Sequence, residues 1–327
     1  MPPVTSDVPK GWCRMALDPA IQPLLDALNA ADAPDSTTMD PPAVRELFRG
    51  MMAFDGDPSA VAKVEERTVP GPTGDIPVRV YRPEGDGPFP ILVWYHGGGW
   101  VIGDLDTADT AARRLCSLAD ALVVSVDYRL APEHPYPAGT DDGWAALTWV
   151  AEHGAELGGD PSRLAIGGDS AGGNLTAQAA LRAAAEGGPA IALQLLVYPC
   201  CDLTLSYPSI RENGEGYFLT EAMMQWFVGH YLSSDVDAED PGVSPLSASD
   251  EALAKVAPAH VITAEYDPLR DEGEAYAARL AELGVPTTSQ RYDGMVHGFF
   301  QMCAITPVAV TANEAAAEAL KKAFAAV

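Results

Sequence analysis

The pentapeptide Gly168-Asp169-Ser170-Ala171-Gly172 lies between an apolar run, residues 163–167, and an alanine-rich run, residues 174–186. The apolar run predicts a strand and the alanine-rich run predicts a helix, so the pentapeptide is the turn that joins them. Glycines on both sides of a serine permit a strained turn, and the helix that follows favours negative charge at its N-terminus. The stretch therefore predicts that Ser170 is a nucleophile at the rim of a sheet.

A second glycine-rich stretch, Tyr95-His96-Gly97-Gly98-Gly99-Trp100, follows another apolar run. Residues without a Cβ allow backbone N–H groups to approach a substrate carbonyl closely. The N–H groups of Gly98, Gly99 and Ala171 are therefore the candidate donors of an oxyanion hole beside Ser170. A glycine triplet alone is more often a plain flexible loop, but its place after a strand and upstream of the serine favours the functional interpretation.

His297 is the candidate base among the six histidines of the chain. It follows a predicted strand, has a glycine on either side, and comes after both the serine and a candidate acid. That acid is Asp267, which ends an apolar run and is held extended by the proline after it. Glu265 is the alternative acid. An aspartate in this place fixes the imidazole tautomer and stabilises the imidazolium.

Other polar residues of these motifs have structural interpretations. His96 is predicted to hold the glycine loop by a hydrogen bond, and Asp169 to brace the serine turn. Asp271 is predicted to be a helix N-cap, with Glu274 completing a capping box. Glu133 and Asp202 are predicted to form supporting hydrogen bonds.

The bulk composition narrows the classes of partner. The chain has 327 residues, 47% of them hydrophobic, which is enough for one large α/β domain. Its 46 acidic and 20 basic residues give a net charge of −26, which repels nucleic acid and anionic membrane surfaces. No run approaches the roughly 20 apolar residues of a membrane span, so no stable membrane insertion is expected. The chain has five cysteines, an odd number without metal-ligand spacing, so we expect reduced thiols and no bound metal. The N-terminus does not resemble a secretory signal, so we expect a cytoplasmic protein.

Short apolar runs that alternate with helical stretches predict a mostly parallel, doubly wound α/β sheet. The expected strands are 78–81, 91–95, 122–126, 164–166, 193–197, 260–264 and 287–292. The expected helices are 107–118, 141–153, 171–185, 273–283 and 312–324, preceded by two helices in the first fifty-odd residues.

The segment 203–240 interrupts this alternation where an α/β sheet keeps its ligand crevice, so we interpret it as part of a lid. Residues 1–55 and 203–240 are predicted to form a helical cap, and residues 56–202 and 241–327 the catalytic core. Trp100, Phe218, Trp226 and Phe227 are the candidate substrate-binding residues. The alternative for the aromatic stretch 223–231 is a stripe that faces the core.

Five motifs in order resemble the hormone-sensitive-lipase-like, or bacterial family IV, esterases of the α/β-hydrolase superfamily: residues 96–100, 127–134, 168–173, 266–270 and 297–299. The resemblance implies an eight-stranded sheet, a helical cap and hydrolysis of short- to medium-chain acyl esters through an acyl-enzyme, without a cofactor. It supports Ser170, Asp267 and His297 as the catalytic triad. Members often dimerise, so a homodimer is a further expectation. Trp100 stands where many relatives carry Phe.

Three alternatives remain open at this point. The same triad serves amidases, deacetylases and lactonases, because the leaving group and the pocket decide among them. A ligand-binding receptor on an inactive hydrolase scaffold is a second class, although such receptors in this family lack the histidine that His297 provides here. A phosphate- or dinucleotide-binding enzyme is the alternative with the least support, because no GxxxxGK[ST] or GxGxxG motif follows a strand.

Overall fold

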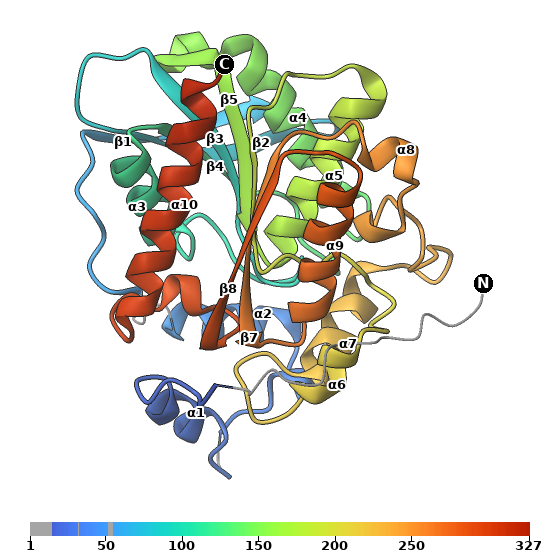
Figure 1. The fold of residues 1–327 in the computed structure, drawn as a ribbon. Coiled ribbons are helices and arrows are strands. Elements are labelled where there is room, and N and C mark those ends of the chain that lie inside the picture. The colour runs from blue at the N-terminus through green and yellow to red at the C-terminus, as the bar shows by residue number, and fades with distance from the viewer. Residues whose placement is uncertain (1–14, 32, 52–54) are drawn as a thin grey trace.

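The computed structural model describes residues 15–31, 33–51 and 55–327. An eight-stranded sheet runs through its centre in the order β1-β2-β4-β3-β5-β6-β7-β8 (Figure 1). β2 is antiparallel to both of its neighbours, and all the other neighbouring pairs are parallel, which confirms the predicted mostly parallel sheet. The strands are β1 (Lys63–Pro70), β2 (Asp75–Arg82), β3 (Phe89–Tyr95), β4 (Leu122–Val126), β5 (Gly159–Asp169), β6 (Gln194–Val197), β7 (Ala259–Tyr266) and β8 (Thr287–Val296).

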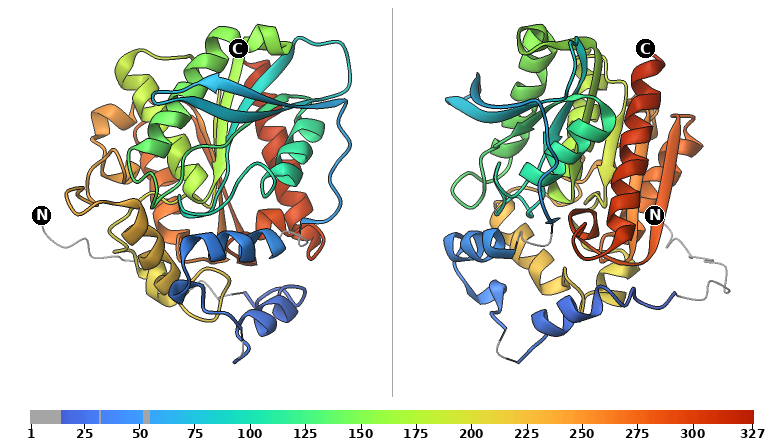
Figure 2. Two further views of the ribbon diagram at one scale, coloured as in Figure 1. Left: turned by 180° about the vertical axis from the view of Figure 1, so that it is seen from behind. Right: turned by 90° about the vertical axis from the view of Figure 1, so that its left-hand side faces the viewer.

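Helices cover both faces of the sheet and the end at which the parallel strands finish (Figures 1 and 2). The α-helices are α1 (Gln22–Leu28), α2 (Pro41–Met51), α3 (Asp109–Ala119), α4 (Ala138–His153), α5 (Ala171–Glu186), α6 (Pro208–Glu212), α7 (Glu221–Tyr231), α8 (Asp250–Leu253), α9 (Arg270–Glu282) and α10 (Pro307–Ala325). A short 3-10 helix, η1 (Ser36–Thr38), lies between α1 and α2.

The alternation of side chains along the strands builds two separate cores. In β3, Ile91 and Val93 pack with α4, α5 and α9 on one face, whereas Leu92 and Trp94 pack with α3 and α10 on the other. All four side chains are fully buried. A strand covered on both faces reads as a continuous apolar run, which is why β3 to β7 are recognisable in the sequence.

One strand is missing from the predicted set. β1 forms the edge of the sheet beside β2, and of its residues only Val69 is buried. An edge strand that is mostly exposed on both faces needs no apolar alternation, so its charged sequence gives no strand signal.

Two predictions about helices need correction. Leu17 and Ile21 share a helical spacing with Leu24, Leu25 and Leu28 in the sequence, which predicts a helix from about Leu17, but α1 begins only at Gln22. Asp271 is not an N-cap, because α9 already begins at Arg270; its carboxylate instead accepts a hydrogen bond from the Ser209 N–H at 3.0 Å.

Helices α1, α2, α6 and α7 lie together at the carboxyl ends of the parallel strands, in the lower part of Figure 1. They come from the N-terminal segment and from the long connection between β6 and β7. The described helices include none that is both long and apolar enough to cross a membrane. The four cysteines in the described ranges are all free thiols, and Cys13 lies outside those ranges.

Candidate active site

Ser170 occupies a strained turn between β5 and α5. Its backbone has φ 56° and ψ −117°, a conformation that non-glycine residues rarely adopt. The turn is packed so closely that a Cβ on Gly172 would collide with the Tyr95 carbonyl oxygen, and a Cβ on Gly168 would collide with the backbone of Gly172. Strain of this kind persists only where surrounding contacts enforce it, and it concentrates at functional sites. Here it presents the serine hydroxyl at the carboxyl edge of the sheet.

A chain of hydrogen bonds links Ser170, His297 and Asp267. His297 follows β8 and Asp267 follows β7, and the distance from His297 Nδ1 to Asp267 Oδ2 is 2.8 Å. The distance from His297 Nε2 to Ser170 Oγ is 3.0 Å. Because an ionised carboxylate only accepts, Nδ1 carries the proton and Nε2 is free to accept from the hydroxyl. The arrangement can withdraw a proton from Ser170.

Asp267 is fully buried, and hydrogen bonds to its side chain and to its backbone fix its position. Its Oδ1 accepts from the Leu269 N–H at 2.8 Å, and its carbonyl accepts from Asn213 Nδ2 at 2.9 Å. Asn213 is a residue that the sequence reasoning missed. It lies between α6 and α7, so the segment that covers the site also fixes the orienting acid.

Glu265, the alternative acid, has different partners. Its carboxylate accepts from the Met15 N–H at 3.0 Å and from the Gly294 N–H at 2.8 Å. Glu265 thus ties the start of the described chain to the end of β8, just before His297. The carboxylate that accepts from the imidazole is that of Asp267 instead.

The candidate oxyanion donors lie near Ser170: Gly98 and Gly99 line the same cavity as Ser170, and Ala171 follows it in the chain. Gly98 and Gly99 have φ values of 116° and 57°, and a Cβ on Gly99 would collide with the Phe227 ring. Within the described residues the N–H groups of Gly98, Gly99 and Ala171 have no hydrogen-bond partner. Free N–H groups beside a nucleophile can receive the negative charge that develops on a carbonyl oxygen.

His96 holds the glycine loop, as predicted, and Asp169, predicted to brace the serine turn, links that turn to the glycine loop. His96 Nδ1 donates to the Gly97 carbonyl at 2.7 Å, and the Gly97 N–H donates to Asp169 Oδ1 at 3.0 Å. Burial lowers the pKa of His96, which keeps the ring neutral, and burial raises the pKa of Asp169 to about 6. Both residues act on the backbone of the loop.

Three of the remaining four histidines have side-chain partners away from Ser170. His153 lies 2.9 Å from Glu156, His230 stacks edge-on against Trp226, and His260 Nδ1 lies 2.7 Å from Thr288 Oγ1. The described residues contain no cluster of three or more His, Cys, Asp or Glu side chains placed to hold a metal ion.

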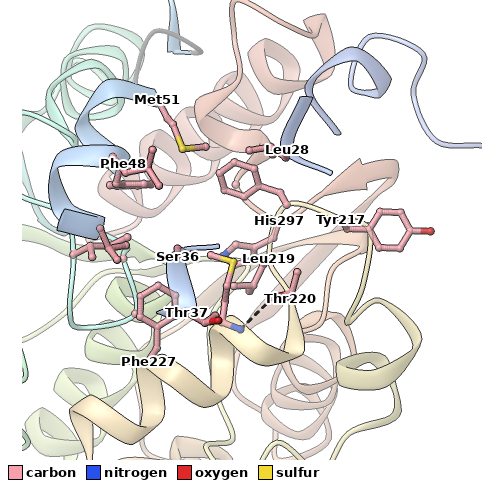
Figure 3. Close-up of a pocket in the computed structure, with 18 of the residues that line it drawn as sticks. Leu28, Ser36, Thr37, Phe48, Met51, Tyr217, Leu219, Thr220, Phe227 and His297 are labelled. Carbon is pink, nitrogen blue, oxygen red and sulfur yellow. Dashed lines mark hydrogen bonds between the residues drawn. The ribbon is translucent and has the colours of Figure 1, made fainter. Parts of the chain in front are cut away.

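A cavity of about 410 Å³ opens above the Ser170 hydroxyl. Its walls come from the N-terminal segment, the glycine loop and the 217–227 segment. Figure 3 shows Phe48 and Met51 of α2 across the cavity from Phe227 of α7. Most of the wall is apolar, and its described residues include the carboxylates of Asp35 and Asp169 but no lysine or arginine. The cavity therefore suits an uncharged, apolar molecule.

Two of the four candidate substrate-binding residues line this cavity. Phe218 and Phe227 do, whereas Trp100 and Trp226 do not. Trp100 is buried and stacks on Tyr231 with ring centroids 4.4 Å apart. Trp226 is one position from Phe227 on α7, and successive helical residues project about 100° apart. The aromatic stripe is thus divided between the cavity wall and packing behind it.

Comparison with known proteins agrees with this geometry. A family model described as alpha/beta hydrolase fold matches residues 92–301. The chain belongs to the α/β-hydrolase fold family. The resemblance inferred from the motifs is thereby confirmed. A solved structure of an α/β-hydrolase enzyme from the metagenome of Lake Arreo has a TM-score of 0.91 and 41% identity, and the match covers 94% of this chain and 99% of that one.

Two relatives from Mycobacterium tuberculosis are carboxylic ester hydrolases by name. Carboxylesterase NlhH is 48% identical over 268 residues, which are 80% of this chain and 83% of that protein. Carboxylic ester hydrolase LipN is 44% identical over 294 residues, which are 88% of this chain and 77% of that protein.

The buried carboxyl of Asp169 predicts a pH-dependent stability. A folded-state pKa near 6 lies above the unfolded value near 3.8, so ionisation makes folding less favourable as the pH rises through this window. Asp169→Asn removes that cost. From pH 4.5 to pH 7 the variant should gain about 2 kcal/mol in unfolding free energy relative to the wild type. Denaturant titrations of both proteins at the two pH values measure it, and an unchanged difference would contradict the raised pKa.

Proposed function

We propose that this chain is a serine carboxylesterase that hydrolyses short- to medium-chain acyl esters through an acyl-enzyme intermediate. The observation that carries the proposal is the hydrogen-bonded chain from Ser170 Oγ through His297 to Asp267, which opens into an apolar cavity. The names of the carboxylesterase relatives support the same reaction class.

The first half-reaction forms the acyl-enzyme. Ser170 Oγ attacks the ester carbonyl carbon while His297 Nε2 takes the hydroxyl proton. The carbonyl oxygen becomes an oxyanion, which the N–H groups of Gly98, Gly99 and Ala171 stabilise. Asp267 stabilises the imidazolium and keeps the ring oriented. The tetrahedral intermediate then collapses, the bond to the alkoxy oxygen breaks, and the imidazolium protonates the departing alcohol.

The second half-reaction releases the acid by the reverse route. His297 Nε2 takes a proton from water, which attacks the acyl carbon, and the same N–H groups stabilise the second oxyanion. The intermediate collapses with return of the proton to Ser170 Oγ, and the carboxylic acid leaves. The product ionises to a carboxylate, and the net charge of −26 disfavours its rebinding.

The cavity supports the choice of substrate. Its walls are closed on two sides by α2 and α7, which supply Phe48, Met51 and Phe227. We propose that residues 1–55 and 203–240 act as a cap that confines the acyl chain and excludes water. A confined apolar site favours short and medium chains over the long chains of lipase substrates. The carboxylates in the wall favour acyl chains without negative charge.

Two further expectations stand as proposals. A homodimer is supported by the exposed edge of the sheet at β8, where Thr288, Ser289 and Gln290 are exposed. A cytoplasmic location is supported by the free thiols of the four described cysteines.

The direct test of the proposed function uses p-nitrophenyl esters of increasing acyl length. The wild type should hydrolyse short and medium chains fastest, and Ser170→Ala should lose at least about 10³-fold in kcat because the nucleophile is gone. A maximum at long chains would contradict the predicted substrate class. Binding of esters without turnover at any length would indicate a receptor on an inactive scaffold.

The orienting acid is tested by a matched pair of isosteric variants. Asp267→Asn should lower kcat by about 10²–10⁴-fold, because an amide favours the wrong imidazole tautomer. Glu265→Gln should lower kcat much less, since Glu265 accepts from backbone N–H groups rather than from His297. Steady-state kinetics on one ester compare the two. Near-full activity in Asp267→Asn together with a large loss in Glu265→Gln would reverse the assignment.

A further inference from the structure

Arg45 on α2 makes an unusual set of contacts with the loop that carries the oxyanion donors. Its Nε donates to the Val101 carbonyl at 2.8 Å, and its Nη2 donates to the Ala131 carbonyl at 2.9 Å. The same guanidinium forms two parallel hydrogen bonds with the Glu133 carboxylate, at 2.9 Å and 2.7 Å. One side chain thus joins the N-terminal helix to two segments of the core. Its planar fork is what makes several such bonds possible at once.

Arg49, one helical turn later on α2, contacts the same loop at its C-terminal end, residue Asp104. Its Nε donates to Asp104 Oδ2 at 2.6 Å. Asp104 Oδ1 in turn accepts from the N–H groups of Asp106 and Thr107, at 3.0 Å and 2.8 Å. Residues four apart share one face of a helix, so α2 holds the loop 98–104 at two points.

The contact at Val101 reaches the oxyanion donors through backbone hydrogen bonds. The N–H groups of Val101 and Ile102 donate to the Gly98 carbonyl, at 3.1 Å and 2.9 Å. A trans peptide is planar, with its C=O and N–H pointing in opposite directions. Whatever fixes the Gly98 carbonyl therefore fixes the direction of the Gly99 N–H, which belongs to the same peptide plane.

Arg45 connects the two segments of this hydrogen-bond network, residues 98–102 and Ala131. The Ala131 N–H donates to the Trp100 carbonyl at 2.9 Å, while the carbonyls of Ala131 and Val101 both accept from Arg45. The loop contains glycines with positive φ and has little conformational preference of its own. Its shape thus depends on such external contacts.

The same helix also faces the substrate cavity. Val44, Leu47, Phe48 and Met51 of α2 line the cavity. The helix therefore lines the cavity on one side and contacts the donor loop on the other.

We propose that Arg45 is a positioning residue for the oxyanion hole: by docking α2 on the loop 98–104 it sets the direction of the Gly99 N–H. The inference rests on the proposed esterase function. Because the oxyanion exists only after attack, this alignment stabilises the transition state and leaves binding of the ground-state ester nearly unchanged. Complete loss of one donor costs about 10²–10³-fold in turnover, so loss of alignment should cost less.

The test substitutes Arg45 by methionine, which keeps an unbranched side chain but removes every donor. Arg45→Met should lower kcat by about 10–100-fold on a short p-nitrophenyl ester, with KM changed by less than about 3-fold. Its affinity for a boronic acid, which forms a tetrahedral adduct with the serine, should fall in parallel with kcat/KM. An unchanged kcat, or a raised KM alone, would overturn the proposal and leave Arg45 as a structural contact between α2 and the core.

Arg163→Met is the matched control. Arg163 also donates to a carboxylate and a carbonyl, those of Asp160 and Pro88, but at the start of β5, away from the site. Arg163→Met should keep kcat within about 3-fold of the wild type. If Arg45→Met acted only by lowering overall stability, both variants would lose activity. If Arg45→Met fails to fold, Arg45→Lys replaces it: a compact ammonium lacks the planar fork that reaches both carbonyls and the Glu133 carboxylate at once, so kcat should still fall.

The outcomes separate this inference from the function on which it rests. A wild type that hydrolyses no ester overturns both. A wild type that hydrolyses esters, with Arg45→Met equal to it in kcat and in boronic acid affinity, overturns the inference alone.

Discussion

The close approach of the Ser170 turn to the end of β3 is the constraint on which the rest of the structure depends. The turn after β5 lies so near the end of β3 that Gly172 has no room for a side chain against the Tyr95 carbonyl. Ser170 therefore has to take a left-handed φ of 56°, and its hydroxyl is directed out of the sheet. The strands β7 and β8 then end where Asp267 and His297 can reach it in sequence.

The backbone around this turn is positioned by side chains that touch no substrate. His96 holds one peptide of the glycine loop, Asp169 holds the one before it, and contacts to the Gly98 carbonyl orient the next. Planar peptides convert each of these contacts into a fixed direction for an N–H group. Donors prepared in this way need no reorganisation when charge develops, which is the main source of electrostatic catalysis.

The sequence predicted the sheet and the main residues of the site, because each depends on local signals. Doubly covered strands such as β3 are continuous apolar runs, and glycines mark the turns at Ser170 and Gly98. Other features depend on contacts between distant segments. The exposed edge strand β1 has no apolar pattern, Asn213 reaches the Asp267 carbonyl across the fold, and Trp100 packs behind the cavity rather than in it. No local pattern specifies such contacts.

The most direct test of the central claim is covalent labelling with diethyl p-nitrophenyl phosphate. The Ser170 oxygen should bond to phosphorus while the bond to p-nitrophenolate breaks, as His297 takes the hydroxyl proton. We expect one equivalent of p-nitrophenolate per chain and a diethylphosphoryl mass increase on the peptide that contains Ser170. Labelling of another residue, or none at Ser170 in a folded protein, would contradict it.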